Sequence, residues 1–115
     1  MSKVFRYTAV KAEDVVMEGS LHVKVRWLIT KEIGADTFAM RIFELEPEGH
    51  SPLHKHAWEH EVFILEGTGN LFDGEKTTPF KAGDVIFVPP NEIHQFVNSG
   101  KELLRFLCLI PYAKE

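Results

Sequence analysis

The segment from His54 to Gly67 constrains this chain more than any other. It reads His-Lys-His-Ala-Trp-Glu-His-Glu-Val-Phe-Ile-Leu-Glu-Gly. On an extended segment, His54 and His56 point to the same face with their backbones roughly 7 Å apart, close enough to share one ion. His60 then opens a run, Val62 to Leu65, whose β-branched and aromatic residues are typical of a strand. The segment therefore predicts three imidazoles at or near the start of one strand.

A fourth candidate imidazole lies in a second segment, residues 83–98. A Gly83-Asp84 turn, an apolar strand and a Pro-Pro-Asn turn lead to His94. On the extended stretch that follows, His94 and Phe96 should face one way, while Gln95 and Val97 face the other. Neither segment is decisive alone, but together they predict histidines that converge on one place.

These two segments resemble the two motifs of the cupin family. The first motif is Gly, about five residues, His-x-His, three or four residues, Glu, six residues, Gly. This chain follows its spacing between Gly49 and Gly67, with one residue fewer before His54. The second is Gly, five residues, Pro-x-Gly, two residues, His, three residues, Asn, matched here by Gly83, Pro89, His94 and Asn98. Asn91 replaces a glycine there, and asparagine tolerates the left-handed backbone that glycine allows. The resemblance covers roughly residues 38–110.

The glutamate of the first motif has two candidates in this chain. Successive strand residues point to opposite faces, so only one of His60 and Glu61 faces inward. His60 satisfies both motif spacings, whereas Glu61 lies one residue too close to the closing glycine. We therefore expect the ligand set His54, His56, His60 and His94, with three histidines plus Glu61 as the alternative. The set is similar to that of small single-domain cupins that bind manganese through four histidines.

The resemblance implies one divalent metal ion, with manganese favoured. Imidazole suits iron, nickel, copper and zinc as well, so the residue types do not select the metal. Four neutral ligands leave the ion its full charge, which favours an anion in the open positions of a six-coordinate site. A closed tetrahedral zinc site is the structural alternative, although such sites usually contain cysteine.

Strand alternation gives candidates for the cavity wall and places the other histidines. The candidate lining residues are Val62, Ile64, Phe96, Phe106 and Cys108, each of which could equally be a plain core residue. His22 is expected on the outer face of a strand, in contact with solvent. His50 is expected in a loop, where contact with solvent is favoured over the alternative of a fifth ligand. Trp58 is expected at the barrel mouth or in a subunit contact.

The resemblance implies a small metalloenzyme, oxygenase-like, that acts on a small organic molecule with an anionic or enolisable group. The alternative is a metal-dependent barrel that binds or senses a small ligand without catalysis. The residues do not name the substrate.

Short segments with frequent turn signals predict an all-β fold. An antiparallel double-sheet barrel fits this pattern and agrees with the jelly roll that the resemblance implies. The expected strands and turns are a short strand at Val4–Tyr7, strands at Leu21–Thr30 and Thr37–Leu45, a loop over 46–52, a two-residue hairpin turn at Asp73-Gly74, and a terminal strand at Glu102–Ile110.

Composition sets the remaining expectations. A chain of 115 residues with 44% hydrophobic content can bury one core, so we expect a single domain, 1–115, with its motifs at 49–67 and 83–98. The net charge of −4, without a basic stripe, argues against a nucleic-acid partner. One cysteine, no signal-peptide pattern and no apolar run near the roughly 20 residues of a membrane span predict a cytoplasmic protein. The apolar outer face of the terminal strand, with Leu103, Leu107 and Leu109, predicts a homodimer.

Overall fold

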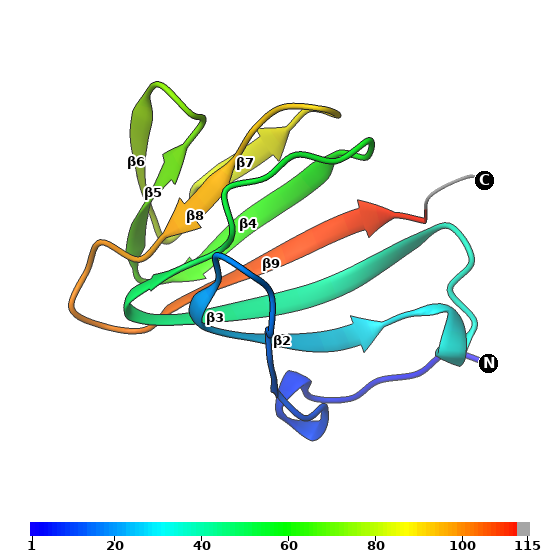
Figure 1. The fold of residues 1–115 in the computed structure, drawn as a ribbon. Helices are drawn as coiled ribbons and strands as arrows, with labels where there is room; N and C mark the ends of the chain where they lie inside the picture. Colours follow the sequence, from blue (N-terminus) through cyan, green and yellow to red (C-terminus); the bar gives the residue numbers. More distant parts are fainter. Residues whose placement is uncertain (113–115) are drawn as a thin grey trace.

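The computed structural model describes residues 1–112, and almost all of its regular structure is antiparallel strand (Figure 1). The all-β prediction is confirmed. The strands are β1 (Glu13–Asp14), β2 (Leu21–Ile29), β3 (Phe38–His50), β4 (His60–Glu66), β5 (Thr68–Phe72), β6 (Thr77–Lys81), β7 (Val85–Val88), β8 (Gln95–Val97) and β9 (Leu104–Pro111). Two short 3-10 turns, Tyr7–Ala9 and Lys31–Ile33, complete the described elements.

The strands form one continuous ladder that curls into an open barrel (Figure 1). Its order is β6-β5-β8-β3-β9-β4-β7, with β2 also paired to β3 and β1 paired to β2. β3 joins the two walls, because it pairs with β2 and β9 along most of its length and with β8 at His50. This topology agrees with the predicted jelly-roll barrel.

β3 is longer than the sequence pattern predicted. The strand was expected to end at Leu45, but it continues to His50, and the pairing with β2 jumps from Leu45 opposite Val23 to His50 opposite Leu21. Residues 46–49 form a bulge in which Glu48 has φ 71° and a Cβ on Gly49 would lie 2.8 Å from the Glu46 carbonyl oxygen. Pro47 lies in this bulge. A bulge tolerates a proline, because its extra residues donate no ladder hydrogen bond.

Two local expectations were also wrong. Val4–Tyr7 is not a strand; the only regular element near it is the 3-10 turn Tyr7–Ala9.

The hairpin between β5 and β6 is present, but its turn is centred one residue later, at Gly74 and Glu75. The Asp73 N–H donates to the Lys76 carbonyl, and the Asp73 carboxylate accepts from the N–H groups of Glu75 and Lys76. Asp73 therefore closes the turn and is not one of its two central residues.

The core lies inside the curled sheet. Its aromatic centre is a stack in which the Phe106 ring lies 4.8 Å from Phe96 and 5.5 Å from Phe43, between ring centroids. The buried Asn98 side chain donates to the carbonyls of Leu45 and Glu102, both at 2.8 Å, and so ties β3 to the loop before β9. The buried apolar residues that form the main core cluster are Val23, Leu45, Val62, Ile64, Phe80, Val88, Phe96, Leu104, Phe106 and Cys108.

The outer face of β4, β7 and β9 is largely apolar, although the exposed Glu61 also lies on it. Phe63, Val85, Phe87, Leu107 and Leu109 line a shallow hollow there, with Val85 and Phe87 exposed by 74% and 59%. Leu103 does not belong to this face. It lies before β9 begins, in a separate hollow with charged side chains such as Lys24 and Arg105.

Within residues 1–112, no helix has the length and apolar character needed to cross a bilayer.

Candidate metal centre

Backbone hydrogen bonds bring the two histidine segments together. His54 and His94 exchange both of their backbone hydrogen bonds, with N···O distances of 3.1 and 2.9 Å. The Asn91 N–H donates to the His56 carbonyl at 2.7 Å, and Asn91 has the left-handed φ of 65° that its place in the second motif predicted. The positions of three imidazoles are therefore set by main-chain pairing.

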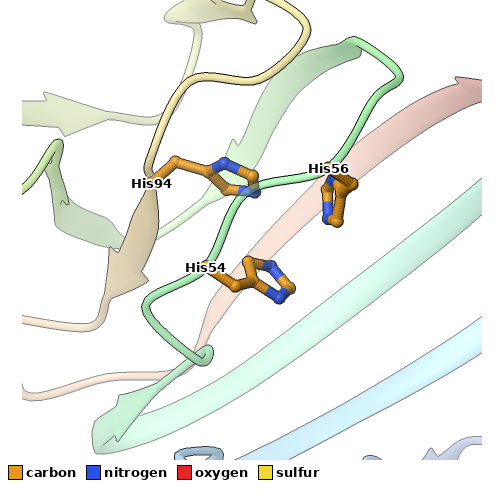
Figure 2. A group of neighbouring side chains, drawn as sticks. All are labelled: His54, His56 and His94. Carbon is orange, nitrogen blue, oxygen red and sulfur yellow. The ribbon is translucent and has the colours of Figure 1, made fainter.

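His54, His56 and His94 form a compact group (Figure 2). One ring nitrogen from each lies within 4.8 Å of the others. For a metal–nitrogen distance of about 2.1 Å, adjacent donors of one ion are about 3 Å apart and opposite donors about 4 Å. The observed spacing is close to this range, so small side-chain rotations would let the three residues share one ion.

His60 adjoins this group from the start of β4. Its Nε2 atom lies 3.3 Å from Nδ1 of His56, and its ring centroid lies 4.7 Å from that of His56 and 4.9 Å from that of His94. His60 is 6% exposed, whereas Glu61 faces outward on the other side of the strand. The alternation along β4 thus turns the imidazole toward the histidine group and the carboxylate away from it.

The imidazoles are held in the neutral form that binds metals. Burial, together with the neighbouring charges of His94 and Arg41, lowers the pKa of His60 to about 3. Burial also lowers the pKa of His56 to about 4, with added repulsion from His54 and His94. Burial and the charge of His94 also lower the pKa of His54. At neutral pH these residues offer lone pairs and carry no charge.

Neighbouring groups orient two of the rings. Nδ1 of His94 lies 2.9 Å from the Glu92 carbonyl, which can only accept, so Nδ1 carries the proton and Nε2 has the free lone pair. Nδ1 of His60 lies 3.2 Å from Sγ of Cys108, and donation to this sulfur leaves Nε2 of His60 free in the same way. Burial raises the pKa of the Cys108 thiol, which keeps it protonated. Such outer partners fix ring orientation and tautomer at metal sites.

Trp58 packs flat against His56, with ring centroids 4.3 Å apart and an interplanar angle of 4°. It therefore supports a ring of the histidine group from outside the cavity. Trp58 was expected at the barrel mouth or in a subunit contact, and the stacking contact places it beside His56.

The histidine group lies at one side of a cavity of about 240 Å³. Of the five expected lining residues, Phe96, Phe106 and Cys108 do line it. Val62 and Ile64 do not, although both are buried: they follow His60 along β4 into the packed core. The other walls come mainly from β2 and β3, as Val23, Val25, Trp27, Arg41, Phe43 and Leu45, with Val15, Met17, Ser51 and Pro52 from the connections.

Sequence reasoning missed Arg41. This residue lies on β3, is only 9% exposed and lines the cavity. Its guanidinium carbon lies 4.7 Å from the ring centroid of Phe43 and 5.3 Å from that of Trp27. The signal was present, because Arg41 is the one charged residue in the alternating stripe Ala39, Arg41, Phe43, Leu45, whose other members are apolar.

The two remaining histidines lie outside the group. His22 is exposed, as predicted. His50 is at the end of β3, where Nδ1 lies 3.2 Å from the Ser51 carbonyl and 3.4 Å from Nε2 of Gln95. Its ring is thus held by polar partners away from the other imidazoles.

The chain is similar to known proteins in sequence and in fold. The chain is 38% identical over 96 residues to the oxalate-binding protein of Thermotoga maritima, an alignment that covers 80% of this chain and 78% of that protein. It is 36% identical over 74 residues to 1-methylthio-D-xylulose 5-phosphate methylsulfurylase of Rhodospirillum rubrum, covering 64% of this chain and 47% of the enzyme. The chain thus spans about half the length of that second relative.

Among solved structures, the polyketide cyclase RemF of Streptomyces resistomycificus superposes with a TM-score of 0.90 at 40% identity, covering 96% of this chain and 80% of RemF. Residues 41–110 match the family Cupin_2, described as a cupin domain. The barrel, the two histidine motifs and this match agree, and the chain is a member of the cupin family.

Proposed function

We propose that this chain, as a single domain of residues 1–115, holds one divalent metal ion through His54, His56, His60 and His94. We further propose that it is an enzyme acting on a small organic molecule with an anionic or enolisable group. The observation that carries the proposal is the convergence of four imidazoles at one side of an otherwise largely apolar cavity.

The donor set supports a charged, catalytically useful ion. Because the pKa values of His54, His56 and His60 are lowered, these ligands are neutral, and an ion among them keeps its full charge. Manganese is the favoured ion by resemblance to four-histidine cupins, and iron, nickel, copper and zinc also suit imidazole. A bound ion of this kind supplies Lewis-acid stabilisation of an enolate or carboxylate oxygen and, when it is manganese or iron, redox chemistry with dioxygen.

The protein itself supplies binding and exclusion of water. Phe43, Phe96 and Phe106 offer flat apolar surfaces beside the histidine group. Such walls lower the local dielectric and so strengthen every electrostatic interaction with a bound anion. The cavity thus has apolar walls and a histidine group at one side. A substrate with an apolar body and one charged or enolisable end fits this arrangement.

The names of two relatives support the same class of substrate. One is a polyketide cyclase, and polyketides carry ketone groups that enolise; the other is an oxalate-binding protein, and oxalate is a dianion. The resemblance to small metal cupins favours an oxygen-dependent reaction for the enolised substrate. The second name also supports the alternative function, a barrel that binds a small carboxylate without converting it.

A single probe separates these functions. Benzoylacetone (1-phenyl-1,3-butanedione) is aromatic and enolisable, and can be followed by its absorbance, by exchange of its central C–H with deuterium, and by oxygen uptake. Protein loaded with manganese or iron should accelerate the deuterium exchange, and an oxygenase would also consume dioxygen. His94→Ala protein should do neither, while His22→Ala serves as the matched control. Tight binding of the probe without exchange or oxygen uptake would instead support the binding barrel.

A further inference from the structure

We propose that Arg41 is the residue that binds the charged end of the substrate, and that the natural ligand of this cavity is therefore an aromatic or similarly planar carboxylate. The inference deepens the proposed function and rests on it for the chemistry at the histidine group. Anion binding by Arg41 itself does not depend on the ion.

Arg41 is a buried charge without a counterion. It is 9% exposed, and none of the ion pairs among residues 1–112 involves it. The nearest acidic residue along β3, Glu44, points to the other face of the strand and is paired with Arg26 and Arg105. The described residues that line the cavity include neither Asp nor Glu. A guanidinium stays charged in proteins, so this site favours an anion supplied from outside the chain.

The hydrogen-bonding capacity of Arg41 is mostly unused. Its Nη2 atom lies 3.2 Å from Sγ of Cys108 and 3.5 Å from Nδ1 of His60. Its Nε atom is buried and has no partner among the described residues. Buried donors without partners are rare in folded proteins, and a guanidinium presents its N–H groups in a fork that matches a carboxylate. A ligand carboxylate would satisfy both the unused donors and the charge.

The surroundings of Arg41 suit a flat apolar ligand body. Phe43 and Trp27 lie against the guanidinium, and Phe106 stacks between Phe43 and Phe96 across the same cavity. An engineered cavity of roughly 150 Å³ accepts benzene. The cavity here is about 240 Å³, room for one ring with a short carboxylate side chain.

Arg41 also lies next to His60, which adjoins the histidine group. Because its Nη2 atom is 3.5 Å from His60, a carboxylate bound to Arg41 places its neighbouring carbon atoms beside the imidazoles. Phenylpyruvate meets these requirements, since it combines a ring, a carboxylate and an enolisable ketone adjacent to that carboxylate. Benzoate tests the ring and the carboxylate alone.

The test compares each acid with its uncharged methyl ester. Binding of phenylpyruvate and benzoate, and of the two esters, is measured by calorimetry on metal-free and metal-loaded protein. The variants are Arg41→Met, which removes the charge at similar length, and Arg41→Lys, which keeps the charge but loses the fork. Lys24→Met is the matched control, because Lys24 is an exposed cation of β2 outside the cavity.

Wild-type protein should bind at least one acid more tightly than its ester, with or without metal. Arg41→Met should weaken binding of that acid about 10- to 100-fold, the usual effect of losing hydrogen bonds to a charged group, and change ester binding little. Arg41→Lys should restore part of the affinity, and Lys24→Met should leave it unchanged. Metal content should be equal in all four proteins.

A separate readout distinguishes a binding residue from a structural one. Removing a buried charge that has no counterion should leave the melting temperature of the ligand-free protein unchanged or raise it. A fall in melting temperature together with loss of metal in Arg41→Met would show that Arg41 only positions His60, and would overturn the proposal. Equal affinity of wild-type and Arg41→Met protein for both acids, or failure of wild-type protein to prefer either acid, would also overturn it. Arg41-dependent acid binding by a protein that takes up no metal would contradict the proposed function and leave this inference standing.

Discussion

His54 and His94 exchange both backbone hydrogen bonds, although they belong to segments far apart in the sequence. This main-chain pairing fixes the distance between the two histidine motifs. The site is therefore largely preorganised. Folding of the barrel already brings the two motifs together, so metal binding does not have to meet the entropy cost of closing the segment between them. An ion needs only small movements of the imidazoles to bind.

The two candidate residues at the start of β4 should differ in their effect on metal binding. His60→Ala should lose most of the metal affinity, because the ring next to His56 is removed. Glu61→Gln should keep it, because Glu61 is exposed on the opposite face. Titration with a divalent ion followed by calorimetry measures both. Metal retained by His60→Ala and lost by Glu61→Gln would support the alternative ligand set.

Cys108 should tune the site without binding the ion. Its sulfur lies 3.2 Å from Nδ1 of His60, and a hydrogen bond donated by Nδ1 to this sulfur would hold the ring in the tautomer with Nε2 free. Cys108→Ala should therefore weaken metal binding about 10-fold, the lower end of the effects seen when outer partners of metal ligands are removed. Cys108→Ser, which keeps an acceptor, should weaken it less. Equal affinities for wild-type and Cys108→Ala protein would show that the sulfur has no such role.

Mild acid should destabilise the metal-free protein. The folded-state pKa values of His56 and His60 are about 4 and 3, whereas unfolded histidines titrate near 6.5. The unfolded chain thus binds more protons below pH 6.5, and the free energy of unfolding falls as the pH drops toward 5. Each such histidine contributes a slope of up to about 1.4 kcal/mol per pH unit. Urea unfolding of wild-type, His60→Gln and His22→Ala protein checks this, since only His60→Gln should flatten the slope.

The apolar outer face of β4, β7 and β9 should form a subunit contact. We propose a homodimer that covers Phe63, Val85, Phe87, Leu107 and Leu109, since an apolar surface of this kind on a small protein is usually buried by a partner. Phe87→Glu should shift the mass measured by light scattering at micromolar concentration from dimer to monomer. Leu103→Glu is the control, because Leu103 lies in the separate charged hollow. A monomer mass for the wild-type protein would contradict the proposal.

Local patterns predicted most of the strands and the direction of the histidines on them, because alternation along a strand depends only on neighbouring residues. His60 and Glu61 are the clearest case. Features that depend on contacts across the barrel were harder to predict. The bulge that carries β3 past Pro47 follows from its pairing with β2, and the exclusion of Val62 and Ile64 from the cavity wall depends on how deep the cavity reaches. Arg41 was visible in the alternating stripe, but only the structure identifies its buried neighbours.

The proposal that four imidazoles hold one ion is tested most directly by the metal content of the protein. The direct measurement is elemental analysis of purified wild-type, His54→Ala, His94→Ala and His22→Ala protein, each dialysed after loading with manganese. We expect one ion per chain in the wild-type and His22→Ala proteins and almost none in the other two. Stoichiometric metal in His54→Ala and His94→Ala protein, or loss of metal from His22→Ala protein alone, would contradict it.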